Sequence, residues 1–395
     1  MRILTIATRV PQLDAKGDQL VAHHRLMALI RSEHQVDLIC CLVSPPSPAD
    51  ELALHHLHSA GIRCQIIVIP RLAQVRNLFS GLFVSTIPLQ AALFRSQACR
   101  KLIETHIRDF DPDLLYLVLF RPYVNVNGID KPLVVDFIDS VSLNYERMTK
   151  KNSLLLRPIF NFETKRSRRY EQELARRAAF SFVVADDDAR NIAPDYVRVL
   201  HNGVDTSKFS GKRDALEIGR IIFSGNMNYG PNAEAVIWFC EKCWPEINRR
   251  YPMTKFVICG ANPSTAVQSL VAAYPNVTVT GRVESVAAEL NKSCISIAPM
   301  QSGAGMQNKI LEAMSCGLPV VTTTLGRGSI AAEPGFDIMI ADDPADFTES
   351  ILTLLEDSSL RDSLGSRARS YVSRKHDWKA IGQSFVTSIE TLSRK

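Results

Sequence analysis

The strongest chemical signal in the sequence is one block, PMQSGAGMQNKILEAMSCGLPVV, at positions 299–321. A predicted strand at 294–299 leads into a loop containing Gly303 and Gly305, and the helix that follows ends at Gly317. A glycine-rich turn between a strand and a helix brings free backbone N–H groups and the positive end of the helix dipole to one point. That combination suits a phosphate, so the block predicts a site for a nucleotide diphosphate.

Two charged side chains in this block extend the prediction. Lys309 would place a positive charge beside the phosphates, and Glu312 can reach the same side of the helix to accept hydrogen bonds from ribose hydroxyls. Negative charge develops on a departing diphosphate, and N–H groups around Gly305 to Gln307 together with the Lys309 ammonium would stabilise it. We therefore expect Lys309 and Glu312 to bind the nucleotide and to take part in catalysis, with no cofactor required.

The carboxylate of Asp139 is the other candidate catalytic group. It follows a predicted strand at 131–137, and ligands gather at the carboxyl ends of strands in open parallel sheets. Asp139 could contact a hydroxyl group of a second substrate or act as the general base for that hydroxyl. Capping of the next helix explains this residue equally well, and both interpretations stay open.

Metal-binding residue types occur without the spacing of a metal site. Cys240 and Cys243 form a C-x-x-C pair, but no second pair completes four zinc ligands. The histidines at 23, 24, 55, 56 and 58 have no carboxylate or cysteine at ligand spacing. Asp186, Asp187 and Asp188 follow the predicted strand at 180–184, but they are better placed to cap the next helix than to bind a metal. We predict no metal site. The odd, scattered set of nine cysteines suits buried thiols in a reducing cytoplasm.

The elements that position these residues alternate between strands and helices. A length of 395 residues allows two domains, and the opening strand, loop and helix, with Gly17 in the loop and Asp18 as a cap, is how a Rossmann-like domain begins. The expected fold class is α/β, with boundaries at 1–201 and 202–376 and a last helix in 377–395 that packs back toward the first domain. The predicted strands are 2–8, 36–43, 62–69, 113–120, 131–137 and 180–184, then 219–223, 255–260, 277–283, 294–299, 320–324 and 337–340. The apolar runs at 36–43 and 62–69 predict buried strands, and a helix is predicted over 232–250.

The excess of basic over acidic residues is confined to the first half of the chain. Residues 1–201 contain 26 Lys and Arg against 21 Asp and Glu, whereas the remainder contains 20 of each. Residues 71–103 contain no acidic residue and many apolar ones, and residues 147–177 contain ten Lys and Arg against three Glu. These segments predict shallow attachment to an anionic membrane surface, although a helical hairpin packed on its own domain explains the first equally well. No nucleic-acid-binding motif is present, so we expect no nucleic-acid partner.

Several of these motifs together resemble the GT-B glycosyltransferases of family 4 (group 1), in particular the branch of sugar transferases associated with exopolysaccharide gene clusters. The likeness rests on MRILTIATRVP at the start, LHNGVD at 200–205, FSGNMNYGPN at 223–232 and the G-x-Q-N-K-x-L-E-A-M block. It implies two Rossmann-like domains facing a central cleft, with the acceptor bound by the first domain and the nucleotide-sugar donor by the second. One departure is Ala304, where the family usually has a Glu eight positions before Glu312.

The resemblance also implies roles for individual residues. Gly17 would lie beneath donor and acceptor, Gly225 and Asn226 beside the diphosphate, and backbone groups near Arg282 and Val283 would hold the base. In place of the missing Glu, backbone groups of 303–306, which include Met306, or the side chains of Gln307 and Asn308 would act on the donor sugar.

The implied function is transfer of a sugar from a nucleotide-diphosphate sugar to an acceptor, with retention of anomeric configuration and without a metal. A lipid-linked saccharide in bacterial exopolysaccharide or cell-surface polysaccharide synthesis is the expected acceptor, and the expected location is cytoplasmic, on the inner face of the plasma membrane. Inversion with Asp139 as the base stays open because of Ala304. A sugar-nucleotide epimerase of the same fold and a non-catalytic nucleotide-sugar-binding protein are the alternatives.

Overall fold

The structure is a computed structural model that describes residues 1–13, 17–84, 86–151, 157–211, 216–303 and 306–392. The chain divides into two compact units, Met1–His201 with Gly382–Lys395, and Asn202–Ile381. Each unit is described separately below.

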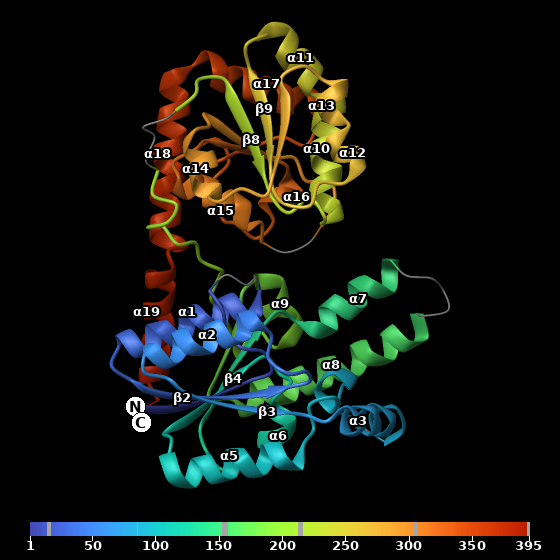
Figure 1. The fold of residues 1–395 in the computed structure, drawn as a ribbon, viewed down its shortest axis with the longest axis vertical. Coiled ribbons are helices and arrows are strands. Elements are labelled where there is room, and N and C mark those ends of the chain that lie inside the picture. Colours follow the sequence, from blue (N-terminus) through green and yellow to red (C-terminus); the bar gives the residue numbers. More distant parts are fainter. Residues whose placement is uncertain (14–16, 85, 152–156, 212–215, 304–305, 393–395) are drawn as a thin grey trace. The chain divides into compact units, whose positions relative to one another are not determined.

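The N-terminal unit is built on a seven-stranded sheet in which every neighbouring pair is parallel (Figure 1). The strand order is β3-β2-β1-β4-β5-β6-β7, so the chain winds outward in one direction from β1 and then in the other from β4. The central strands are apolar and buried on both faces, as expected for a parallel sheet covered by helices. The strands are β1 (Arg2–Ala7), β2 (Gln35–Leu42), β3 (Arg63–Val68), β4 (Leu114–Val118), β5 (Leu133–Ile138), β6 (Phe180–Val183) and β7 (Val197–Val199).

Helices cover both faces of this sheet, with α1 and α2 on one side and α5 and α6 on the other (Figure 1). The last helix of the chain, α19 (Trp378–Glu390), contributes Phe385 to this unit, where its ring contacts Tyr116 and Phe182. The other helices are α1 (Asp18–Arg31), α2 (Pro48–Ser59), α3 (Arg71–Val84), α4 (Leu89–Ala92), α5 (Gln97–Phe110), α6 (Tyr123–Val126), α7 (Val141–Lys151), α8 (Arg157–Arg177) and α9 (Asp186–Ile192).

The C-terminal unit contains a second parallel sheet, of six strands, in the order β10-β9-β8-β11-β12-β13. Its strands are β8 (Arg220–Ser224), β9 (Lys255–Cys259), β10 (Val277–Gly281), β11 (Ile295–Ala298), β12 (Val320–Thr322) and β13 (Met339–Ile340). Its helices are α10 (Gly230–Lys242), α11 (Trp244–Arg250), α12 (Thr265–Gln268), α13 (Leu270–Ala273), α14 (Val286–Asn291), α15 (Asn308–Ser315), α16 (Thr324–Arg327), α17 (Pro344–Glu356) and α18 (Ser358–Lys375).

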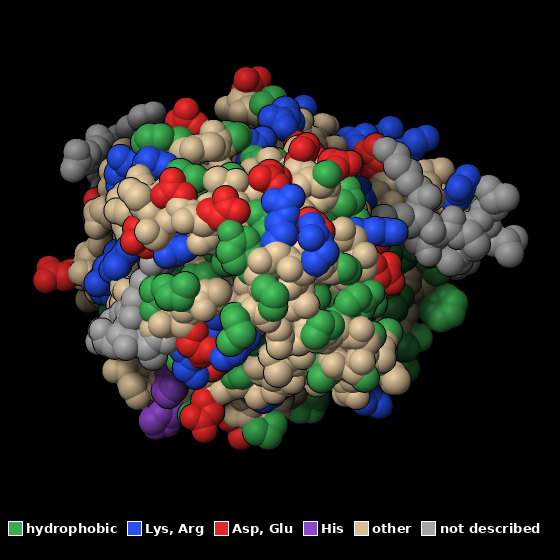
Figure 2. All heavy atoms as spheres, turned by 90° about the horizontal axis from the view of Figure 1, so that it is seen from above, with side chains coloured by type: hydrophobic (Ala, Val, Ile, Leu, Met, Phe, Trp, Pro, Cys, Tyr) green, Lys and Arg blue, Asp and Glu red, His purple; other side chains and the backbone are tan. Residues whose placement is uncertain are grey.

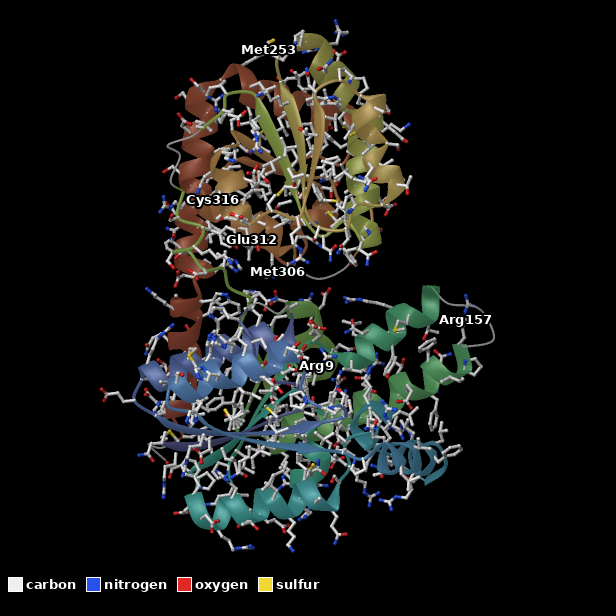
Figure 3. The ribbon with its side chains drawn as sticks, in the orientation of Figure 1. Arg9, Arg157, Met253, Met306, Glu312 and Cys316 are labelled. Atoms are coloured by element: carbon white, nitrogen blue, oxygen red, sulfur yellow. The ribbon has the colours of Figure 1, made fainter. Side chains whose placement is uncertain are left out.

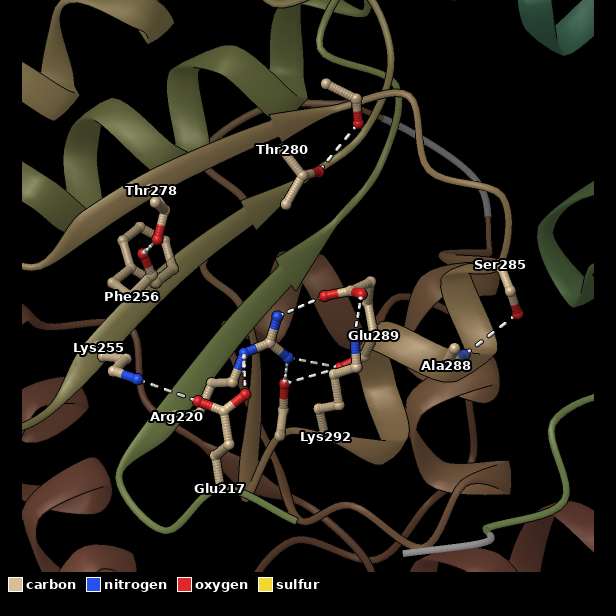
Figure 4. A network of polar contacts seen from close by, with 12 residues as sticks. Glu217, Arg220, Lys255, Phe256, Thr278, Thr280, Ser285, Ala288, Glu289 and Lys292 are labelled. Carbon is tan, nitrogen blue, oxygen red and sulfur yellow. Dashed lines mark hydrogen bonds and ion pairs between the residues drawn. The ribbon is translucent and has the colours of Figure 1, made fainter. Parts of the chain in front are cut away.

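A polar network around Arg220 fixes the amino end of this second sheet (Figure 4). The Arg220 guanidinium, at the start of β8, donates to the backbone oxygen of Glu289 at 2.7 Å and to Ser293 Oγ at 2.6 Å. It also forms an ion pair with the Glu289 carboxylate of α14. The network lies at the opposite end of β8 from the loop in which ligands are expected, so its role is to hold α14 against the sheet.

Four details differ from the sequence-based expectation. The helix expected over 232–250 is divided at Cys243, because Pro245 in the next turn has no N–H to continue the hydrogen-bond ladder. An additional strand, β7, follows β6. The strand expected to be buried at 62–69 is β3, an edge strand with an exposed pattern. Asp18 is the first residue of α1 rather than its cap, and its carboxylate pairs with Arg9 instead.

A buried polar cluster holds the start of α7, directly after Asp139. The Glu171 carboxylate of α8 accepts from Val141 N at 2.7 Å and Ser142 Oγ at 2.6 Å. The Asp188 carboxylate of α9 accepts from Ser140 N at 3.0 Å. These two carboxylates supply the capping that Asp139 was considered for, since the Asp139 carboxylate makes no hydrogen bond to the described part of α7.

The burial of this cluster predicts a pH-dependent stability. Burial raises the pKa of Glu171 from 4.5 to about 7 and that of Asp188 from 3.8 to about 6. A raised pKa means that the folded state binds more protons than the unfolded state. The free energy of unfolding should therefore fall as pH rises through this range, and Glu171 should account for most of the fall above pH 6, with a smaller share from Asp188.

The Glu171→Gln variant should lose most of that fall, which we expect to be about 1 kcal/mol between pH 6 and 7 in the wild type. Urea unfolding at pH 5, 6 and 7 measures it. Glu173→Gln, an exposed position on the same helix, is the control and should behave as the wild type. An unchanged slope in Glu171→Gln would show that Glu171 does not titrate in this range.

Candidate active site

The C-terminal unit changes winding direction between β8 and β11, which are adjacent in the sheet. Ligands bind outside the carboxyl ends of strands at such a switch point in open α/β sheets. The two loops that begin there carry most of the predicted donor-binding residues, with Gly225 and Asn226 after β8 and the glycine-rich loop to α15 after β11. The topology therefore brings two distant sequence motifs to one edge of the sheet.

Close backbone packing after β8 requires glycine. A Cβ on Gly260, which follows β9, would lie 1.7 Å from the Gly225 carbonyl oxygen, and a Cβ on Gly225 would lie 2.7 Å from Asn232 Nδ2. Neither position has room for a side chain. The loop is held on β9 by backbone hydrogen bonds, because Gly225 N donates to the Cys259 oxygen and Met227 N to the Ala261 oxygen, both at 2.9 Å.

Lys309 is held at the switch point by groups from both loops. Its ammonium donates to Asn232 Oδ1, lies 3.5 Å from Met300 Sδ and lies 4.7 Å from the centre of the Phe223 ring. The side chain of Asn232, which is buried at the start of α10, also donates to the backbone oxygen of Asn226 at 2.9 Å. Asn232 thus connects the Lys309 ammonium to the loop after β8.

The start of α15 presents polar groups beside Lys309. Gln307 precedes the helix without a side-chain cap, and the buried Oδ1 of Asn308 has no hydrogen-bond partner among the described residues. An uncapped helix start with an unsatisfied acceptor is suited to a ligand that carries both negative charge and hydroxyl donors. Gly303 has φ 110°, a conformation that favours glycine, whereas Gly305 and Ala304 lie outside the described residues.

The remaining predicted donor residues lie on the same carboxyl edge. Glu312 is half-buried one turn after Asn308 on α15, and Figure 3 labels it together with Met306. Met306 and Val283 are partly buried against one core cluster, so the loops that carry them pack on a common base. Arg282 follows β10 at the edge of the sheet and is exposed.

The predicted residues of the N-terminal unit follow β1 and β5, which flank β4, and the winding of this sheet reverses between β1 and β4. Gly17, with φ 64°, ends the loop after β1 and precedes Asp18. Ile138, at the end of β5, has φ 65°, a costly conformation for a β-branched residue, and it sets the direction of the chain into Asp139. Strain of this kind is often retained where a neighbouring group has a function.

The surroundings of Asp139 suit a base. The Asp139 side chain is exposed, but desolvation by the surrounding protein raises the pKa of its carboxyl, the nearby Asp18 carboxylate raises it further, and Arg147 acts in the opposite direction. A carboxylate with a raised pKa binds a proton more strongly than an ordinary surface carboxylate. Asp18 is itself paired with Arg9 at 2.9 Å, so Asp139 belongs to a charged group at the ends of β1 and β5.

Two features of these sites were not anticipated from the sequence. One is the role of Asn232, although it lies within the FSGNMNYGPN motif. The other is a cavity of about 610 Å³ in the N-terminal unit, lined by residues after β1, β2 and β4 that include Arg9 and Arg121. Arg121 had no local motif to single it out, because its position depends on the fold of three separate segments.

The metal and membrane predictions can be compared with the described residues. Cys240 and Cys243 are both buried in the core of the C-terminal unit. Within the described ranges, no three His, Cys, Asp or Glu residues are grouped so that they could hold a metal ion. In the same ranges, no helix is sufficiently long and apolar to cross a membrane.

Part of the chain is similar to known glycosyltransferases. Residues 219–357 match the family model for "Glycosyl transferases group 1". An uncharacterized 44.6 kDa protein in the cps region of Klebsiella pneumoniae is 22% identical over 400 residues, which cover 97% of this chain and 98% of that protein. A D-inositol 3-phosphate glycosyltransferase of Corynebacterium jeikeium is 34% identical over 84 residues, covering 21% of this chain and 20% of its own.

Solved structures agree on the fold. HepE from Anabaena, in complex with UDP, has a TM-score of 0.65 at 16% identity and covers 99% of this chain and 100% of its own. TarM has a TM-score of 0.65 at 11% identity, with 98% of each chain covered. The predicted fold class, GT-B, and the predicted enzyme class, glycosyltransferase, are both confirmed, and the match to the group 1 model lies in the C-terminal unit.

Proposed function

We propose that this glycosyltransferase uses a nucleotide-diphosphate sugar as donor and a lipid-linked saccharide as acceptor, in the synthesis of an exopolysaccharide or other cell-surface polysaccharide. The observation that carries the donor assignment is the position of Lys309 at the β8/β11 switch point, beside the uncapped start of α15. The relative from a cps region and the UDP complex of HepE support the pathway and the donor class.

The proposed chemistry follows from these groups. The α and β phosphates lie against the start of α15 and the Gly225 loop, and the Lys309 ammonium offsets the charge that develops as the diphosphate leaves. Glu312 accepts from the ribose hydroxyls, and the loop of Arg282 and Val283 lies along the base. We propose that no metal or cofactor takes part and that the anomeric configuration is retained. Asp139 contacts the acceptor hydroxyl from the N-terminal unit.

We further propose that α3 attaches the enzyme to an anionic lipid surface. Four apolar side chains on one face of α3 are exposed: Leu72, Val75, Phe79 and Leu82. The opposite face is fixed by polar contacts, since Asn77 donates to the Arg95 backbone oxygen at 2.6 Å and Gly81 O accepts from Arg166 at 2.5 Å. These contacts orient the helix so that its apolar face stays in solvent, which is the reverse of an ordinary amphipathic helix.

The neighbouring helix α8 extends this surface. Its Ile159 and Phe162 are exposed, and Arg166, which bonds α3, lies 5.0 Å from the Phe162 ring centre. Exposed basic residues lie on the same two helices: Arg71, Arg76, Arg157, Lys165 and Arg169. Exposed apolar and basic side chains on one pair of helices suit shallow insertion into anionic lipid. By contrast, the face drawn in Figure 2 mixes basic and acidic side chains.

The donor assignment predicts the effect of removing one charge. Lys309→Met keeps the apolar stem but loses the ammonium, so binding of the preferred nucleotide should weaken by about 10- to 100-fold, as for loss of a charged hydrogen bond. Calorimetric titration with UDP, GDP, ADP and dTDP, without added metal, measures this. Lys292→Met is the control, because Lys292 pairs with Glu289 of α14. Equal affinity in Lys309→Met and wild type would refute the donor site.

The membrane assignment predicts a separate effect. Leu72→Glu with Phe79→Glu should reduce cosedimentation with vesicles containing phosphatidylglycerol by more than 10-fold, because two apolar anchors become anionic. Binding by the wild type should also fall at high salt and with neutral phosphatidylcholine vesicles. Met253→Glu, at an apolar residue of the C-terminal unit that is 88% exposed, is the control (Figure 3). Undiminished cosedimentation of the double variant would count against α3 as the attachment site.

A further inference from the structure

The cavity of the N-terminal unit has the composition of a binding site for an amphiphilic anion. It opens at the carboxyl ends of β1 and β2 and is bounded on another side by α4 and Arg121. Much of its wall is apolar, including Val10, Leu42 and Phe94. Two guanidinium groups, from Arg9 and Arg121, are its positive charges. All of these residues belong to one unit.

Arg121 is held in place by neutral groups. Its Nε and Nη2 donate to Gln90 Oε1 at 3.2 and 3.0 Å, and its guanidinium lies 5.9 Å from the Phe94 ring centre. Gln90 is oriented in turn by donating its amide to Tyr145 Oη at 2.9 Å. Among the described residues, no carboxylate lies within ion-pair distance of Arg121. The N–H donors of the Arg121 guanidinium are therefore held in position, while its positive charge has no direct ion pair in the described part of the chain.

The nearby carboxylates are engaged elsewhere. Asp18 pairs with Arg9 at 2.9 Å. Asp50, which lines the cavity, accepts from Ser47 N at 2.9 Å and from Gln12 in the capping box of α2. Burial lowers the pKa of Arg121, and the like charge of Arg9 lowers it further. Asp18 and Asp50 equal the two guanidiniums in number, but the ion pair at this site joins Asp18 to Arg9. The Arg121 guanidinium has no anionic partner among the described residues, and an oxyanion would supply one.

We propose that this cavity binds the acceptor, and that the acceptor carries an oxyanion held between Arg9 and Arg121. The inference rests on the proposed function and specifies the acceptor's chemistry. The oxyanion is either the phosphate that joins a saccharide to a lipid or the carboxylate of a uronic acid, since a guanidinium recognises both in the same bidentate manner. The apolar wall would contact the adjoining lipid or sugar face.

The position of α4 favours the phosphate. α4 carries Gln90 and packs on α3, where a Cβ on Gly81 would lie 3.1 Å from the Ala92 Cβ. The residue that orients Arg121 is therefore on a segment in direct contact with the proposed lipid-facing helix. A phosphate at the head of a membrane lipid would reach the cavity along this side of the unit.

Calorimetric titration tests the proposal with three probes: geranyl diphosphate, methyl α-D-glucuronoside and the neutral octyl β-D-glucoside. At least one anionic probe should bind the wild type, and Arg121→Met should weaken it by 10-fold or more while leaving UDP affinity unchanged. Tighter binding of the diphosphate identifies a lipid phosphate, and tighter binding of the glucuronoside identifies a uronate. Arg121→Lys, which keeps the charge without the fork, should give an intermediate loss, and Arg108→Met, at an exposed position on α5, should give none.

Three results would overturn the proposal. The first is failure of both anionic probes to bind the wild type. The second is equal binding of the neutral glucoside and the better anionic probe. The third is a loss of UDP affinity in Arg121→Met as large as the loss for the anionic probe, which would assign the cavity to the donor's diphosphate. A wrong donor assignment gives a different result from a wrong acceptor proposal. If only the donor assignment is wrong, the wild-type protein binds no nucleotide, but binding of the anionic probe still depends on Arg121.

Discussion

The candidate donor site depends on one buried amide. Asn232 accepts from the Lys309 ammonium through Oδ1 and donates to the Asn226 backbone oxygen through Nδ2. A lysine that contacted only solvent would sample many rotamers, but here its charge is fixed between the ends of β8 and β11. Because the amide is buried, water competes poorly for these bonds, and the cation is positioned before any ligand arrives.

The two units have the same sheet topology at their candidate sites but carry different charged groups there. In each, the sheet reverses its winding at a central pair of strands, and the loops that diverge from that pair carry the polar groups. The C-terminal unit offers a lysine and a helix start, which suit a diphosphate. The N-terminal unit offers a carboxylate with a raised pKa and two guanidiniums, which suit a hydroxyl nucleophile on an anionic acceptor. A transferase needs both kinds of site.

Features set by neighbouring residues in the sequence could be predicted, whereas features set by residues far apart in the chain could not. The parallel sheets and the glycine-rich loop before α15 were predictable, because alternating strands and helices and a Gly-rich turn are local patterns. The burial of β3 was predicted wrongly, because an apolar run does not distinguish a central strand from an edge strand. Glu171 and Arg121 could not be singled out, since their partners are 29 or more residues away along the chain. The site assignments themselves stay predictions.

Hydrogen exchange measured by mass spectrometry, with and without the nucleotide that binds best among UDP, GDP, ADP and dTDP, tests the central assignment most directly. If the donor diphosphate lies at the β8/β11 switch point, amides in peptides covering 224–232 and 299–312 should exchange more slowly when the nucleotide is bound. Binding that left both peptides unprotected would contradict the assignment and place the donor elsewhere on the enzyme.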